Sequence, residues 1–91
     1  MNRQYTLEQI KNWRLIGRGM PTGTLVVYMP EKNENSLLTT GKMYLWDGEI
    51  AGIRGASTIV DNRGHKFWGI PTKDFRLVPQ EIIVELSRDF S

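Results

Sequence analysis

The sequence predicts one mainly β domain of the α+β class, in which short antiparallel strands form a small barrel and a single helix precedes them. Two observations predict this class. Between residues 37 and 78, short aliphatic and aromatic runs alternate with glycine turns, which is typical of consecutive hairpins. Residues 6–16 carry a helical pattern instead. The chain has 91 residues, 40% of them hydrophobic and 24% charged, so residues 1–91 are expected to form a single globular domain.

The helix is expected over residues 6–16. Thr6 and Gln9 have the spacing of a capping box, in which each side chain accepts a hydrogen bond from the other residue's backbone amide. Apolar residues then recur at every third position as far as Trp13 and share one face of the helix. Gly17 and Gly19 favour the end of the helix, because glycine adopts the left-handed conformation at low cost.

The first strand is expected over residues 24–29. Apolar side chains point to both of its faces, so this strand is expected to be either central in the sheet or covered by the helix. The polar residues 31–36 predict an exposed loop. A second strand is expected over residues 42–46, and Asp47-Gly48 predicts a tight turn after it. Residues 49–56 include two glycines and predict an irregular loop.

A hairpin is expected next, with strands over residues 57–61 and 66–70. The segment Asp61-Asn62-Arg63-Gly64 suits a type I turn followed by a left-handed glycine. Thr72 is then expected to cap one short helical turn before a last strand over residues 76–78.

The C-terminal segment fits two patterns, because short apolar runs do not separate strand from helix by periodicity alone. The strand pattern consists of Ile82, Val84 and Leu86, and the helical face of Ile82, Ile83, Leu86 and Phe90. We expect a strand over residues 81–86. The barrel would then span residues 24–86 around a core at residues 37–78.

The net charge of +2 is too small to indicate a nucleic-acid partner by itself. The charges are nevertheless uneven along the chain. The basic N-terminal segment holds Arg3, Lys11, Arg14 and Arg18 against Glu8, and the acidic C-terminal segment holds Glu81, Glu85 and Asp89 against Arg88. These ends could be complementary in a homo-oligomer, although exposed charges are more often simply solvated.

The composition also restricts the cellular setting. The chain has no cysteine, which excludes disulfides, thiolate chemistry and Cys-based zinc sites and fits a reducing cytoplasm. The N-terminal segment lacks the apolar stretch of a signal peptide. No apolar run approaches the ~20 residues that span a bilayer. We therefore expect a cytoplasmic protein with no membrane partner.

No residue pattern indicates catalysis. His65 is the one histidine, and it lies beside a hairpin turn without a nucleophile or carboxylate at a suitable spacing. Residues 52–57 could hold a phosphate through backbone amides, but an expected strand follows them where a phosphate loop needs a helix. We therefore expect a protein that is not an enzyme and that uses no cofactor and no metal ion.

Within residues 37–78, a strand beginning Gly-Lys-x-Tyr precedes a hairpin with a glycine turn, an aromatic return strand, a proline and a short turn containing phenylalanine. The residues of this pattern are Gly41, Lys42, Tyr44, Asp61, Asn62, Gly64, Phe67, Trp68, Pro71 and Phe75. The pattern resembles the small SH3-like domains often encoded by tailed bacteriophages and their prophages. The resemblance implies an SH3-like barrel, but that family is functionally mixed and implies no binding site. The loop at residues 49–56 and the N-terminal helix and strand depart from the family pattern.

Two functions are compatible with these features. The first is a phage-type accessory factor that binds and modulates a host protein in the bacterial cytoplasm, in host takeover or anti-defence. The contact would be made by the glycine loop at residues 49–56 and by exposed aromatic side chains, which bury much area at little entropic cost. The residues expected to contact the partner are Trp13, Arg14, Arg18, Trp46, Arg54 and Trp68. Because their strands have two faces, at least one of Tyr44, Trp46 and Trp68 is expected to lie outside or under the helix.

The second function is nucleic-acid binding by a small barrel, with basic side chains at phosphates and Trp46 or Trp68 stacked on bases. The basic residues expected to take part are Arg54, Arg63, Lys66, Lys73 and Arg76. Residues 41–80 hold six basic and four acidic side chains, which is a weak excess for a surface that follows phosphates. The sequence therefore favours the protein-binding function.

Overall fold

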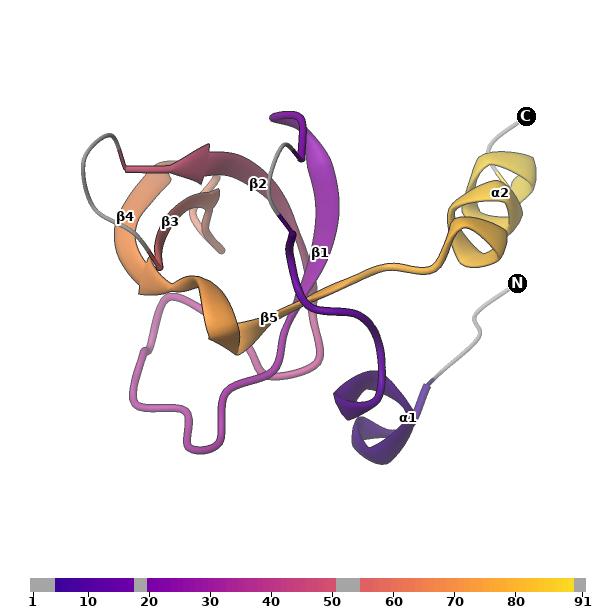
Figure 1. The fold of residues 1–91 in the computed structure, drawn as a ribbon, viewed down its shortest axis with the longest axis horizontal. Helices are drawn as coiled ribbons and strands as arrows, with labels where there is room; N and C mark the ends of the chain where they lie inside the picture. Colours follow the sequence, from indigo (N-terminus) through magenta and orange to yellow (C-terminus); the bar gives the residue numbers. More distant parts are fainter. Residues whose placement is uncertain (1–4, 18–19, 51–54, 90–91) are drawn as a thin grey trace.

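A computed structural model describes residues 5–17, 20–50 and 55–89, which form one antiparallel sheet and two α-helices (Figure 1). The strands are β1 (Thr24–Tyr28), β2 (Met43–Glu49), β3 (Ala56–Val60), β4 (Lys66–Pro71) and β5 (Phe75–Leu77). The helices are α1 (Leu7–Lys11), the 3₁₀ helix η1 (Thr72–Asp74) and α2 (Gln80–Asp89). The predicted mainly β class is confirmed. The strands predicted at residues 24–29, 57–61, 66–70 and 76–78 are observed with ends shifted by at most one residue.

The strands lie in the order β4-β3-β2-β1-β5, and each neighbouring pair is antiparallel. Within the described residues, β4 and β5 are the two edges, so the sheet is open and is not the closed barrel that the sequence predicted. The two edge strands are joined by η1 instead of a hairpin turn, and they do not pair with each other.

The sheet separates two apolar clusters. The inner cluster consists of Val26, Tyr28, Leu38, Tyr44, Trp46, Ile59, Ile70 and Phe75. The outer cluster consists of Ile10, Val27, Val78 and Ile82, and thus includes residues of both α-helices. The neighbours Val26 and Val27 are both buried but belong to different clusters, and β1 lies between β2 and β5, which agrees with the prediction of a central or helix-covered strand. Each fully buried aliphatic side chain stabilises the fold by roughly 1.5–3 kcal/mol.

Helix α1 is shorter than the helix predicted over residues 6–16. The capping box is confirmed by reciprocal hydrogen bonds of 2.9 and 3.1 Å. The helix ends at Lys11, because the following residues run along the free edge of β5. There the carbonyl of Arg14 accepts a hydrogen bond of 2.7 Å from the Leu77 amide. The backbone amides at the edge of a strand need hydrogen-bond partners. The hydrogen bonds formed with β5 therefore outweigh the local preference of residues 12–16 for a helix.

The strand predicted over residues 81–86 is wrong, because this segment belongs to α2. The carbonyl of Pro79 accepts hydrogen bonds of 3.0 and 3.2 Å from the amides of Ile82 and Ile83. Proline suits a helix start, because the amide proton it lacks would have no partner there. Ile82 is buried in the outer cluster while Val84 is 41% exposed, so burial follows the helical pattern.

The turn predicted at Asp47-Gly48 is also wrong, because both residues lie within β2. Between Trp46 and Glu49, β2 has one residue more than the facing part of β3. The extra residue forms a β-bulge, and Gly48 adopts a φ of +94°, which glycine tolerates best. The glycine therefore bends a continuous strand where the sequence predicted that the strand would end.

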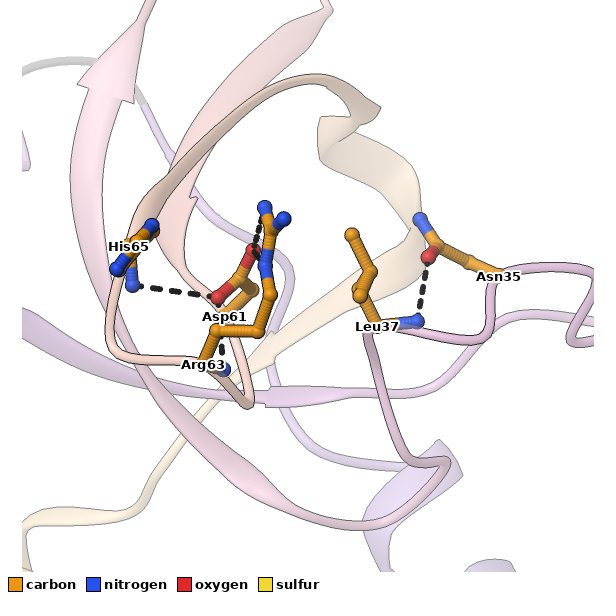
Figure 2. Close-up of polar contacts among 5 residues, drawn as sticks. All are labelled: Asn35, Leu37, Asp61, Arg63 and His65. Carbon is orange, nitrogen blue, oxygen red and sulfur yellow. Dashed lines mark hydrogen bonds and ion pairs between the residues drawn. The ribbon is translucent and has the colours of Figure 1, made fainter.

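The turn predicted between β3 and β4 is confirmed. Gly64 has a φ of +79°, and its amide donates a hydrogen bond of 2.9 Å to the carbonyl of Asp61. Figure 2 shows that the Asp61 carboxylate accepts from the backbone amides of Arg63 and His65, at 2.9 and 3.2 Å, and from the Arg63 guanidinium at 2.8 Å. One carboxylate thus fixes the whole turn.

The loop between β1 and β2 is held against this turn. The Asn35 side chain accepts a hydrogen bond of 2.9 Å from the amide of Leu37 (Figure 2), and the carbonyl of Leu37 accepts one of 3.1 Å from the amide of Asn62. The Asn62 side chain in turn accepts from Lys42 and from the Tyr44 hydroxyl, at 2.8 and 2.9 Å. The side chains at residues 31–34 are exposed, as predicted for this loop.

A single helical turn forms before β5, as predicted, but Thr72 does not cap it. The Thr72 hydroxyl lies 2.6 Å from the Ser57 hydroxyl and donates a long hydrogen bond of 3.5 Å to Glu49. Ser57 also accepts a hydrogen bond of 2.9 Å from the indole of Trp46. The threonine therefore links η1 to the inner cluster instead of to its own helix.

Candidate functional site

Part of the outer sheet face is covered by neither of the two described α-helices. In Figure 1, α1 and α2 lie on the same side of β1, and β3 and β4 lie away from them. On this uncovered part, the inward-facing residues of β2, β3 and β4 belong to the inner cluster or are hydrogen-bonded to it. The residues that alternate with them therefore face outward. We call the outward set the outer patch, which consists of Leu45, Asp47, Thr58, Val60, Lys66 and Trp68.

Trp68 is the most prominent residue of the outer patch. Its side chain is 71% exposed, the highest fraction of any large hydrophobic residue in the part of the chain that the structure describes. β4 has one residue more than β3 between Phe67 and Ile70, and Gly69 has a φ of +83° in this bulge. Bulges redirect the side chains beside them. Leu45, two strands away, adds a second apolar side chain that is 49% exposed.

An ion pair crosses the outer patch. Lys66 Nζ on β4 lies 3.0 Å from Asp47 Oδ2 on β2, so the pair passes over β3. The β2 bulge contains Asp47 and the β4 bulge contains Trp68, and both bulges face Thr58. The two opposite charges neutralise each other. The exposed indole of Trp68 is therefore the main group of the patch that has no partner within it.

The other predicted partner-binding residues do not join Trp68. Trp46 is only 5% exposed and lies in the inner cluster, so it is not available to a partner. Trp13 packs edge-on against Tyr5 with ring centroids 5.5 Å apart, beside α1, and Arg14 is exposed next to it. Arg18 and Arg54 lie outside the described residues. The predicted set is therefore not one continuous surface.

The basic residues predicted to contact nucleic acid are mostly engaged within the chain. Arg63 pairs with Asp61, and Lys66 pairs with Asp47. The Arg76 guanidinium donates to the carbonyls of residues 11, 73 and 75 at 3.2, 2.7 and 3.2 Å. Lys73 is exposed, and Arg54 lies outside the described residues. These contacts reduce the number of cations that are free to follow a phosphate backbone.

Among the residues that the structure describes, three titratable groups have clearly shifted pKa values. The Arg63 side chain holds the pKa of the Asp61 carboxyl below its usual value, with help from two backbone amides, although burial acts against this. Burial raises the pKa of Asp74, and Lys73 and Arg76 only partly offset this effect. Burial also raises the pKa of the Tyr28 hydroxyl, and the Asp74 carboxylate adds to the increase.

Asp61 is expected to make the fold sensitive to acid. Its pKa is lower in the folded chain than in the unfolded chain, where it is about 3.9. The unfolded chain therefore binds more protons between these two values, and stability falls as the pH drops through this window. We expect the melting temperature of Asp61→Asn to vary less with pH below about pH 4 than that of the wild type.

Thermal melts of both chains between about pH 2 and pH 6 would measure this effect. Arg63→Met serves as the matched variant, because it removes the main cause of the shift and keeps the carboxylate. We expect its acid-induced loss of stability to be smaller than in the wild type and to end at higher pH, because the pKa of Asp61 in the folded chain then lies closer to its value in the unfolded chain. Identical pH profiles for Asp61→Asn and the wild type would contradict the role assigned to this carboxylate.

Two features of the outer sheet face were not predicted from the sequence. One is the exposure of Leu45, and the other is a hollow beside α1. The sequence holds no signal for which face of the sheet the helices cover. The hollow is formed by segments distant in sequence, including Tyr5, Val27 and Met43. No local pattern encodes such a juxtaposition.

Comparisons of the chain with protein-family models, with curated proteins and with solved structures find no match. Within the described residues, no group of three or more histidine, aspartate or glutamate side chains is arranged to hold a metal ion. No described helix has both the length and the apolar character needed to cross a membrane.

Proposed function

We propose that this protein is a non-catalytic binding module that contacts another protein through the outer patch. The observation that carries the proposal is the 71% exposure of Trp68 on a folded sheet. An indole in water contributes nothing to the core, whereas a buried indole at an interface is among the strongest contributors to binding. The neighbouring ion pair and the half-exposed Leu45 supply a polar rim and a further apolar contact.

The class of module that we propose is an SH3-like domain. Five antiparallel strands in the order β4-β3-β2-β1-β5, with a single 3₁₀ turn before the last strand, support it. The glycine turn after Asp61 and the aromatic return strand β4 add to this support. Together with the sequence resemblance, they favour a phage-type accessory factor that binds and modulates a host protein inside a bacterial cell.

The test is to identify a partner in a bacterial lysate and then measure its affinity for purified variants. Val84→Ala is the matched control, because Val84 is 41% exposed but lies on α2, outside the outer patch. We expect Trp68→Ala to weaken binding about 30-fold or more, which corresponds to the ~2 kcal/mol of an interface hot spot. Val84→Ala should bind as the wild type does.

Two results would contradict the proposal. One is a Trp68→Ala variant that melts like the wild type and keeps full affinity for every specific partner. The other is micromolar binding to a short single-stranded oligonucleotide that weakens steeply with salt, because this behaviour would favour the nucleic-acid function instead. Surface substitutions usually change stability by less than about 0.5 kcal/mol, so Trp68→Ala is expected to remain folded.

A further inference from the structure

The two edges of the sheet differ in what lies beside them. The edge of β5 is covered by the chain itself, because the Leu77 amide donates a hydrogen bond of 2.7 Å to the carbonyl of Arg14. Among the described residues, no segment pairs in this way with β4, whose neighbouring strand is β3. An uncovered strand edge carries backbone groups that can pair with another strand.

The hydrogen bonds between β3 and β4 show which backbone groups of β4 face the open edge. The carbonyl of His65 accepts a hydrogen bond of 2.8 Å from the amide of Asp61, so the backbone of His65 faces β3. In an antiparallel pair, successive residues direct their backbone groups alternately toward the neighbouring strand and away from it. The amides and carbonyls of Lys66 and Trp68 therefore face away from β3.

The space beside this edge is open. Lys66, Trp68 and Gly69 are all exposed. A Cβ atom on Gly69 would meet no atom of the described residues within 4 Å apart from its neighbours in the chain. A hollow of about 550 Å³ lies between β4 and the loop at residues 32–37. A further strand thus has room to lie beside β4.

The exposed residues of β4 suit a second copy of the same strand. When two β4 strands lie antiparallel around a two-fold axis at Phe67, Lys66 of each copy lies opposite Trp68 of the other. About four backbone hydrogen bonds then join these residues. The aliphatic stem of Lys66 covers part of the indole, while its ammonium group keeps the ion pair with Asp47. An axis at Lys66 would instead place two like charges opposite each other, which is unfavourable.

We propose that this protein forms a weak homodimer, in which β4 pairs with β4 of a second copy in the register that places Lys66 opposite Trp68. The pairing gives the indole of Trp68, which is 71% exposed, a contact beside the open edge. The bulge at Gly69 and the missing amide proton of Pro71 end the pairing. Because the β5 edge is covered, the assembly closes at two copies.

The dimer would place two outer patches side by side on one continuous sheet. The inference does not rest on the proposed function, because it concerns the protein in the absence of any host partner.

Sedimentation equilibrium of the full-length chain between about 10 µM and 1 mM tests the dimer, because so short an interface is expected to be weak. We expect the average mass to rise from that of one chain toward that of two across this range. Trp68→Ala should raise the dissociation constant about 10-fold or more. Leu45→Ala is the matched control, because Leu45 is 49% exposed in the same outer patch but lies two strands from the edge. It should leave the dissociation constant within about twofold of the wild type.

Disulfide trapping tests the register, since the chain has no cysteine of its own. Lys66→Cys and Trp68→Cys are prepared separately and oxidised alone and as an equal mixture. In the proposed register the Cα atoms of residues 66 and 68 from different copies lie roughly 5.5 Å apart, within reach of a disulfide. Two copies of residue 66, or of residue 68, lie more than about 7 Å apart. We expect the mixture to form its mixed disulfide about 10-fold faster than either variant alone forms a disulfide.

Three results would overturn the proposal. The first is the mass of a single chain at every concentration up to about 1 mM. The second is an equal loss of affinity in Leu45→Ala and Trp68→Ala, which would indicate contact between the faces of two outer patches. The third is a mixture of the two cysteine variants that oxidises no faster than each variant alone. All three are measured without a host protein, so a failure of the proposed function would leave them unchanged.

Discussion

Replacing Trp46 with alanine is expected to remove about 3–5 kcal/mol of folding free energy, the usual cost of deleting a buried aromatic side chain. Trp46 is 5% exposed, belongs to the inner cluster and donates its indole N–H to Ser57 at 2.9 Å. A domain of this size has only about 5–15 kcal/mol of net stability, so the substitution would remove a large fraction of it. Urea denaturation followed by circular dichroism would measure the loss.

Trp46→Phe separates the packing of the ring from its hydrogen bond. The phenyl ring fills most of the same space, and Ser57 keeps Thr72 as a hydrogen-bond partner at 2.6 Å. We expect a cost of about 1 kcal/mol for this variant, which is typical of one lost hydrogen bond. If Trp46→Ala lost less than about 1 kcal/mol, the indole would have to be exposed in solution and available to a partner after all.

Replacing Ile82 with alanine is expected to cost about 2–5 kcal/mol, because Ile82 is 7% exposed and ties α2 to the outer cluster. Val84→Ala on the same helix is expected to cost less than about 0.5 kcal/mol, because that side chain points to solvent. Denaturant midpoints of the two variants, compared with that of the wild type, would measure the difference.

This pair also distinguishes a helix from a strand in the C-terminal segment. In a strand, Ile82 and Val84 would share one face, and the two substitutions would have similar effects. In α2 they point in different directions, and only one of them is buried. Equal losses of stability for both variants would therefore contradict α2 and restore the strand that the alternating pattern suggests.

The candidate site was predictable only in part. Trp68 is among the residues that the sequence predicts to contact a partner, and the sequence predicts that at least one of three aromatic residues lies outside or under the helix. Trp46 has the same local pattern and the same chemical character, yet it is buried and bonded to Ser57. Periodicity shows which residues share a face of a strand, but burial depends on what covers that face.

The basic residues illustrate the same limit. Their positions in the sequence made Arg63, Lys66 and Arg76 candidates for phosphate contacts. In the folded chain each one has an internal partner, either a carboxylate or a set of backbone carbonyls. The partners of Lys66 and Arg76 are distant in sequence, at Asp47 and Lys11, so composition alone did not reveal them. The partner of Arg63 lies two residues away in the same turn.

The sequence by itself determined the local elements that depend on a few neighbouring residues. These include the capping box at Thr6, the glycine turn at residues 61–64 and four of the strands, because hydrogen bonds and backbone preferences within a short segment set them. Tertiary structure alone decided where α1 ends, that residues 80–89 form a helix and that β2 continues through Gly48. In each of these cases the outcome depends on a partner far along the chain: the edge of β5, the outer cluster or the register with β3. The energy of such contacts is not encoded in any local pattern.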